Sequence, residues 1–419
     1  MAIIFVSQFL FFFHASLIDV PWGDGLLAIR EFEELGLVGF LTKPVNEHFV
    51  LVPRLINSLD LYLGHYALPI SGHLTLVAYL SFVFFSARLV LASFPMPLAT
   101  ILMAGLAVTA FSTYRLTVLS NPINNSHFLV GFFSAVSIWW SARAIHGKGA
   151  GKVFDWAIAF AAGVAAVGTA ASGAVSFLVV AVFLGVRRFA VQLNGFNKML
   201  MIVSLTLASF IGLALVTSFN TPSTDILPNL WATMKFGLGI LGLPISGLTR
   251  FGLFGLLVGG LTAGLAIWAV AECLANKHSG IIGFFGLGLV CWGLLTIFLI
   301  ALFRHQIYGD FIGQGHRYGI YNLFVHIGIV FAARHRIENW CRSGTRLRGL
   351  QRASVVLAVM GLVSSAVIGN MLSDRKAQFG QIASQLTSDG NLDVRLFRQI
   401  SFFSSESEAR EIYTRYVYR

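Results

Sequence analysis

Residues 2–25 read AIIFVSQFLFFFHASLIDVPWGDG, an apolar stretch that ends in a polar turn containing two aspartates. Residues 2–18 predict a first transmembrane helix, although a short one, since about 20 apolar residues cross a bilayer. The stretch has neither the basic start nor the small-residue cleavage site of a signal peptide, so we expect it to be retained. The segment that follows, 19–70, contains seven of the 18 acidic residues. Carboxylates are costly near a bilayer, so this cluster is predicted to have a function.

The composition is that of a polytopic membrane protein. Hydrophobic residues make up 56 % of the chain and charged residues 11 %, whereas about 25 % of the residues in a typical soluble domain are charged. A soluble fold is therefore excluded. The net charge of +11 is explained by Lys and Arg in cytoplasmic loops beside anionic lipid headgroups, and not by nucleic acid. The three cysteines have no zinc-site spacing and predict no external disulfide.

Apolar segments of spanning length predict an all-α fold with about 11 transmembrane helices. The distribution of Lys and Arg favours a cytoplasmic N-terminus, an external first loop and an external C-terminus. We therefore predict a transmembrane domain over 1–372 and a short external helical tail over 373–419. The predicted spans are 2–18, 71–93, 97–117, 127–144, 153–169, 171–187, 199–218, 250–271, 280–303, 317–333 and 353–372.

The first external loop, 19–70, is predicted to contain two helices that lie at the membrane interface. Asp24 can begin the first, Lys43-Pro44 ends it, and Asn46 can cap a second that carries Glu47, His48 and Arg54. Glu47 and Arg54 are seven residues apart and share a face, either as site residues or as an ordinary ion pair. In the first helix the predicted apolar side consists of Leu26, Ile29, Phe32 and Leu35, and the side facing water of Arg30, Glu31 and Glu34.

Later segments add polar and glycine-rich features. Residues 304–321, RHQIYGDFIGQGHRYGIY, gather arginines, histidines and tyrosines at a membrane boundary on the side of the first loop. Residues 219–249 start with turn residues and continue as a semi-apolar stretch that either lies in the interface or re-enters the membrane. Glycine runs at 237–247 and 252–264 predict close helix packing. The basic run 334–352 predicts a cytoplasmic lipid anchor.

Several of these motifs resemble the GT-C superfamily of integral-membrane glycosyltransferases, in its bacterial polyprenyl-phosphate-sugar-dependent form. Such members carry approximately D-D-W, then N-E-H-R, then R-L in the first loop. The counterparts here are Trp22-Gly23-Asp24, Asn46-Glu47-His48 and Pro53-Arg54-Leu55, and Arg317-Tyr318 resembles an Arg-Tyr pair that opens a late helix. The chain has one aspartate where the paired form has two, and Phe49 where an arginine often follows the histidine.

The resemblance implies transfer of a hexose or pentose from a polyprenyl-phosphate donor to an acceptor glycan or lipid, on the outer face of a bacterial inner membrane. Inverting transfer needs a carboxylate base for the acceptor hydroxyl and cationic groups at the departing phosphate. The predicted catalytic residues are Asp24, with Asp19 as the alternative base, and Glu47. No cofactor is expected, and a metal at His48 is not favoured because a lone histidine lacks diagnostic spacing. The predicted substrate-binding residues are Lys43, His48, Arg54, Arg304, His316, Arg317 and Tyr318.

Other interpretations stay open. An O-antigen polymerase or ligase would also act on lipid-linked glycans, but such enzymes usually keep their catalytic arginines in a large later loop. A lipid-linked glycan flippase or transporter would have charged residues near the membrane centre and broken helices in paired positions. Asp24 could be only a helix cap, and Arg317 only an arginine that extends from the membrane to the interface.

Overall fold

The computed structural model describes most of the chain as helix. The described residues are 2–17, 24–43, 50–63, 69–112, 115–120, 124–146, 151–190, 230–246, 252–275, 280–308, 317–387 and 410. No strand occurs within these ranges, which agrees with the predicted all-α class. The predicted span 199–218 lies outside them.

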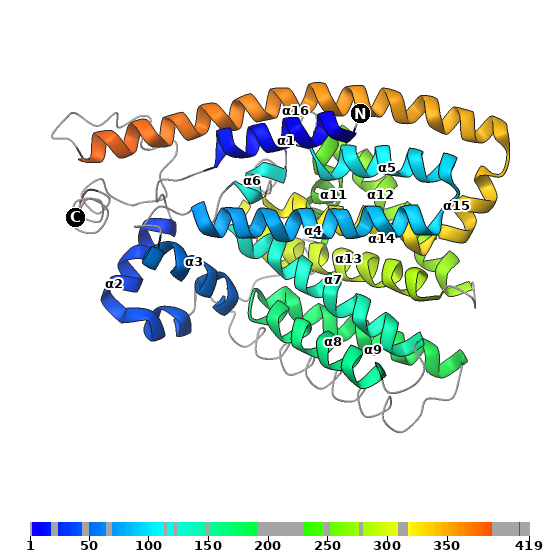
Figure 1. The fold of residues 1–419 in the computed structure, drawn as a ribbon, viewed down its shortest axis with the longest axis horizontal. Helices are drawn as coiled ribbons and strands as arrows, with labels where there is room; N and C mark the ends of the chain where they lie inside the picture. The colour runs from blue at the N-terminus through cyan, green and yellow to red at the C-terminus, as the bar shows by residue number, and fades with distance from the viewer. Residues whose placement is uncertain are drawn as a thin grey trace.

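The long helices run roughly side by side, and α2 and α3 form a separate group at one end of them (Figure 1). Most predicted spans coincide with a helix, although α5 ends at Ala110, earlier than its predicted span 97–117. The elements are α1 Ala2–Ser16, α2 Asp24–Thr42, α3 Leu51–Leu63, α4 Pro69–Ser93, α5 Met96–Ala110, α6 Leu116–Leu119, α7 Asn125–His146, α8 Gly151–Val167, η3 Ala171–Gly173, α9 Ala174–Ala190, α11 Leu230–Ser246, α12 Gly252–Ala275, α13 Gly280–Tyr308, α14 Tyr321–Ala332, α15 Arg334–Cys341 and α16 Gly344–Thr387.

Within the described ranges, five helices are long and apolar enough to cross a membrane. The chain is thus an all-α protein with the helices of a multi-pass membrane protein, while the number eleven stays a prediction. The five segments are Ile70–Ser93, Asn125–His146, Leu253–Ala275, Gly280–Leu302 and Gly344–Ile382. Shorter apolar helices cover Ile3–Ser16, Met96–Ala110, Ala171–Gly185 and Leu230–Leu243.

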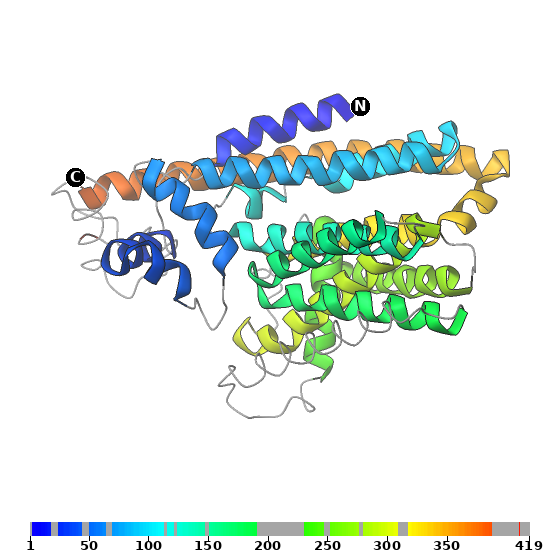
Figure 2. The same ribbon diagram turned by 60° about the horizontal axis from the view of Figure 1, so that its bottom comes forward.

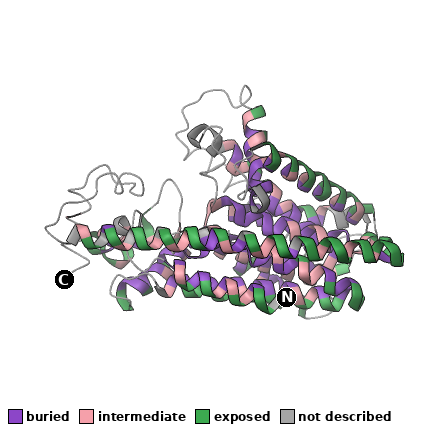
Figure 3. Ribbon diagram, turned by 90° about the horizontal axis from the view of Figure 1, so that it is seen from above, coloured by how far each residue is buried: buried purple, intermediate pink, exposed green. Residues whose placement is uncertain are grey.

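The outer helices expose apolar faces. On α16, Val356, Val363 and Met371 are each more than half exposed, and Figure 3 shows exposed residues along the whole length of this helix. On α12, Leu257 and Leu261 are similarly exposed. In water such faces would be unstable, whereas lipid tails cover them without cost, so they fit a surface that faces hydrocarbon.

The last long helix differs from its prediction. We expected a span over 353–372 followed by a separate tail from residue 373, but α16 is one continuous helix from Gly344 to Thr387. It lies along α1 and α5 (Figure 2), and Gly369 allows the ring of Phe12 in α1 to approach its backbone. The predicted domain boundary at 372 therefore falls inside a helix. Residues 388–419, apart from Arg410, lie outside the described ranges.

The second difference concerns residues 219–249, which we expected to be interfacial or re-entrant. Their described part is the regular helix α11, which packs along α12 and α13. A Cβ atom on Gly242 would collide with the carbonyl oxygen of Gly255, and one on Gly259 with that of Leu238. The two backbones are therefore in direct contact, as the glycine runs predicted.

The first loop contains the two expected helices, α2 and α3. The first begins at Asp24 and ends at Thr42, as predicted. The second begins at Leu51, later than the proposed cap Asn46, which lies outside the described ranges. Pro53 is tolerated in the first turn of α3 because the N–H groups there have no partner within the helix.

Candidate functional site

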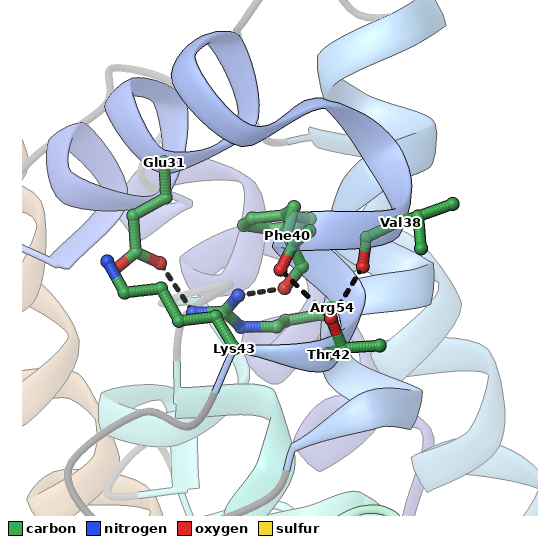
Figure 4. Close-up of polar contacts among 7 residues, drawn as sticks. Glu31, Val38, Phe40, Thr42, Lys43 and Arg54 are labelled. Atoms are coloured by element: carbon green, nitrogen blue, oxygen red, sulfur yellow. Dashed lines mark hydrogen bonds and ion pairs between the residues drawn. The ribbon is translucent and has the colours of Figure 1, made fainter.

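The guanidinium of Arg54 is the centre of the polar contacts in the first loop (Figure 4). Its Nη2 donates to Oε2 of Glu31 at 2.5 Å, and its Nη1 donates to the carbonyl oxygen of Phe40. The same guanidinium lies 4.5 Å from the centroid of the Phe40 ring, which adds a cation–π contact. Arg54 is only 4 % exposed, so these contacts fix α3 against α2.

The backbone geometry of α2 explains why a carbonyl is available to Arg54. The last carbonyl groups of a helix have no partner within it and favour a cation nearby. Phe40 lies in the last turn of α2, so the guanidinium satisfies one of these carbonyls. Gly36 has φ 66° and ψ 177°, a conformation essentially restricted to glycine, and it kinks the helix before that turn.

Glu31 corrects the predicted polarity of α2. We expected it to face water, but its side chain is only 12 % exposed and it pairs with Arg54 and, at 2.9 Å, with Lys43. On the apolar side, Ile29 and Phe32 are buried as predicted, whereas Leu35 is 45 % exposed. The prediction assumed one straight helix, and the kink at Gly36, immediately after Leu35, breaks that regularity.

A second buried carboxylate joins α3 to the first long span. Both oxygens of Asp60 accept backbone N–H groups at the start of α4, from Ile70 at 2.7 Å and from Ser71 at 2.9 Å. The side chain thus caps α4 from a different helix, where a negative charge also suits the helix dipole. Burial raises the pKa of Asp60 above its ordinary value of 3.8, and the hydrogen bonds from Ser71 and Ile70 oppose that rise.

The described part of the 304–321 segment packs against α7. Arg317 lies over the ring of Tyr318 with its Cζ atom 5.1 Å from the ring centroid. The Tyr318 ring in turn meets the His127 imidazole of α7 edge to face at 5.3 Å. His127 Nδ1 is also 3.1 Å from the Tyr321 hydroxyl. A guanidinium, an imidazole and two phenols therefore occupy one corner of the bundle.

Two further contacts secure this corner. Arg115, which is 1 % exposed, donates from Nη1 to the carbonyl oxygen of Gly319 and from Nε to that of Thr109 at 3.2 Å. Asn322 Nδ2 donates to the carbonyl oxygen of Ile240 in α11 at 3.3 Å. Arg115, α11 and the His127 end of α7 thus hold the start of α14 from three different parts of the chain.

The first turn of α7 connects this corner to the first loop. Asn125 Nδ2 donates to Asn57 Oδ1 of α3 at 3.3 Å, and His127, two residues later, contacts Tyr318 and Tyr321. Loop helix α3 and the 317–321 segment therefore lie against the same end of α7. We call the residues Asn57, Asn125, His127, Arg317, Tyr318 and Tyr321 the α7 corner.

The predicted site residues divide into three groups. Arg317 and Tyr318 are in the α7 corner, and Arg54 and Lys43 are together in the α2–α3 cluster. Asp24 begins α2 and Arg304 lies in the last turns of α13, but their side chains are outside the described part. Asp19, Glu47, His48 and His316 lie entirely outside the described residues, so a pair between Glu47 and Arg54 stays a prediction.

Four residues were missed as contributors to this end of the molecule. Glu31, Asp60, Arg115 and His127 each bind a group distant in sequence, and sequence spacing carries no signal of such contacts. Arg115 offered one clue, because it is a lone basic residue between two apolar segments. Within the described ranges, no group of three or more His, Cys, Asp or Glu side chains is placed to hold a metal ion.

Comparison with known proteins adds no assignment. No protein-family model, curated protein sequence or solved structure matches this chain.

Proposed function

We propose that this chain is a membrane glycosyltransferase that moves a sugar from a polyprenyl-phosphate donor to a hydroxyl of an acceptor glycan or lipid. The proposal places the reaction at the external face of a bacterial inner membrane, with the N-terminus in the cytoplasm. The observation that carries it is the shared contact with α7, which brings the acidic first loop and the Arg317 segment to one end of the bundle.

The chemistry requires both of these segments. The acceptor oxygen attacks the anomeric carbon as the bond from that carbon to the phosphate oxygen breaks, and the pair of electrons leaves with polyprenyl phosphate. The acceptor proton goes to a carboxylate, for which Asp24, or otherwise Asp19, is proposed. Arg317 is proposed to bind the departing phosphate, because a guanidinium offers two parallel donors to it.

The α2–α3 cluster has a supporting part in this proposal. Arg54 was predicted to bind substrate, but its donors are bound to Glu31 and Phe40 and its side chain is buried. We therefore propose that it positions the loop that carries Asp24, and that Lys43, which is 48 % exposed, is the cation of this cluster that solvent or a ligand can reach.

The test is release of polyprenyl phosphate from a panel of polyprenyl-phosphate hexoses and pentoses by the purified full-length protein. We expect release to be lost in Asp24→Asn or in Asp19→Asn, and strongly reduced in Arg317→Gln. Arg348→Gln, an exposed arginine of α16, is the control for a lost charge. Wild-type release in both aspartate variants would exclude the proposed base. Movement of intact lipid-linked sugar across vesicles without release would favour the transporter alternative.

A further inference from the structure

The second feature of this molecule is an apolar cavity of about 410 Å³. Its walls come from α4, α5, α14 and α16, and most of the lining side chains are apolar. Its volume lies within the range of about 300–1,000 Å³ typical of small-molecule sites. Among the lining residues are Val90, Leu102, Leu106, Val330, Phe331 and Leu350.

One wall of the cavity is the N-terminal half of α16. The helix face that lines the cavity also carries an arginine, Arg346. Leu350, Ala353 and Gly361 line the cavity and recur at the spacing of one helix face. Arg346 is one turn before Leu350 and two turns before Ala353, so it extends the same face beyond the cavity. Arg348 and Arg352 project from the opposite side of the helix by the same periodicity.

Arg346 is positioned at the corner where α15 meets α16. Its guanidinium carbon lies 5.6 Å from the centroid of the Trp340 ring, and both side chains are exposed. An exposed tryptophan beside arginine is typical of the level of lipid headgroups. Six arginines occur between residues 334 and 352, so this end of the molecule attracts anions.

The polar atoms near the cavity also indicate the kind of ligand. His326 lines the cavity, and its Nδ1 is buried without a hydrogen-bond partner among the described residues, as is Nε of Arg334 at the start of α15. Buried polar atoms without partners are costly. A phosphate oxygen of a lipid would accept a hydrogen bond from Nε of Arg334, whereas a pure hydrocarbon chain would not. Nδ1 of His326 is a donor or an acceptor according to its tautomer, so it does not distinguish the two ligands.

We propose that this cavity and its arginine rim bind one anionic phospholipid. An acyl chain occupies the space between α4, α5, α14 and α16, and the phosphate binds Arg346 beside Trp340. The proposed phosphate site is separate from the first loop, because α15 and the start of α16 lie at the opposite end of the molecule from α2 and α3 (Figures 1 and 2). The proposal does not depend on the proposed enzymatic activity.

The experiment measures lipid retention by native mass spectrometry of the full-length protein, delipidated in detergent. The probes are phosphatidylglycerol and phosphatidylcholine, which carry the same two oleoyl chains and differ in headgroup charge, and polyprenyl phosphate. We expect preferential retention of phosphatidylglycerol by the wild type. Arg346→Gln should weaken that retention about tenfold, the effect of losing one charge-assisted hydrogen bond, whereas Arg348→Gln should not.

A second arm fills the cavity. A Cβ atom on Gly105 meets no atom within 4 Å, so Gly105→Leu should occupy the cavity without displacing backbone and should reduce retention of both lipids. Gly264→Leu, on α12, is the control, because its Cβ position is equally open and distant from the cavity lining. If Gly105→Leu aggregates during size-exclusion chromatography, Ser354→Leu, from the α16 wall, replaces it.

Three results would overturn the proposal. They are equal retention of the two phospholipids, unchanged retention in Arg346→Gln together with the cavity-filling variant, and preferential retention of polyprenyl phosphate over phosphatidylglycerol. The last result would assign the cavity to the proposed sugar donor instead.

Discussion

Arg54 of α3 and Glu31 of α2 are joined at 2.5 Å, with the arginine side chain 5 % exposed and the glutamate side chain 12 % exposed. The other oxygen of Glu31 binds Lys43 at 2.9 Å, but that lysine is 48 % exposed. One carboxylate therefore holds a buried cation and a solvated cation at the same time. The two pairs should differ greatly in their contribution to stability, because loss of the carboxylate leaves only the first cation without water.

We predict that Glu31→Gln destabilises the protein much more than Lys43→Ala. Breaking a buried ion pair costs about 3–5 kcal/mol, and this pair should fall near the lower limit because Glu31 keeps some exposure. Removal of an exposed partner costs about 0–1 kcal/mol. The measurement is the apparent melting temperature of the detergent-purified protein.

The double variant Glu31→Gln with Arg54→Gln is the control for this prediction. It removes the charge on both sides and should recover part of the stability lost in Glu31→Gln. Equal melting temperatures for Glu31→Gln and Lys43→Ala would show that Arg54 is solvated in the protein and does not hold α3 against α2.

The second prediction concerns the contact between α11 and α12. Gly259→Ala should lower the apparent melting temperature, since the added methyl group would meet the carbonyl oxygen of Leu238 and force the helices apart at a cost of about 1–3 kcal/mol. Its neighbour Gly260 has no atom within 4 Å of the Cβ position. Gly260→Ala should therefore leave the melting temperature unchanged or raise it slightly. A loss of stability in both variants to the same degree would contradict direct backbone contact.

Much of the fold could be predicted because bilayer thickness and backbone hydrogen bonding leave few choices to an apolar segment. The start of α2 at Asp24 and the glycine contact between α11 and α12 followed from local signals in the same way. The end of α16 did not. Residues 373–387 are more polar than the span before them, which predicted a boundary, but no proline occurs between Gly344 and Thr387 and the helix continues through Gly380.

The site was less predictable for a different reason. Glu31 and Arg54 are 23 residues apart, and Arg115 reaches Gly319 across 204, so no periodicity relates them. The polar and apolar pattern of α2 predicted that Glu31 faces water, because that pattern considers one helix alone. The partner that removes Glu31 from water is on α3, and its position depends on how the chain reverses after the Gly36 kink.

The third prediction is a pH dependence from Asp60. Burial raises the pKa of this carboxyl above 3.8, so the folded protein takes up the proton more readily than the unfolded chain. The resulting contribution to stability is complete below pH 3.8 and is lost as the pH rises through the raised pKa. The side-chain amide of the variant Asp60→Asn does not titrate, so the melting temperature of the wild type should fall relative to that of the variant over this range.

The control for this prediction separates the effect of the lost hydrogen bond, which does not depend on pH, from the effect of the titration. In Asp60→Asn an NH2 donor replaces one of the two oxygens that accept from Ile70 and Ser71, so one of these two hydrogen bonds is lost at every pH. In thermal scans at several pH values in one buffer series, the melting temperatures of the two proteins should therefore differ by a constant amount plus an amount that changes with pH as Asp60 titrates. A difference between the two proteins that does not change with pH would mean that Asp60 has its ordinary pKa.

The last prediction tests the α7 corner. His127 contacts the ring of Tyr318 and the hydroxyl of Tyr321, and Tyr318 lies beneath the guanidinium of Arg317. If the corner positions Arg317 for a donor phosphate, His127→Ala should raise the KM for the polyprenyl-phosphate sugar with a smaller effect on kcat, because the cation is displaced but not removed. Arg317→Gln should reduce kcat as well, since charge on the departing phosphate develops in the transition state.

Rescue distinguishes positioning from simple loss of packing. His127→Gln retains a group that can hydrogen-bond to Tyr321, so its KM should be close to that of the wild type. His127→Phe fills the space without that bond, so its KM should stay raised. Tyr321→Phe removes the hydroxyl from the other side and should have no further effect in the His127→Phe background. Equal KM values for His127→Gln and His127→Phe would show that the imidazole only fills space, and would leave Arg317 without the proposed support from α7.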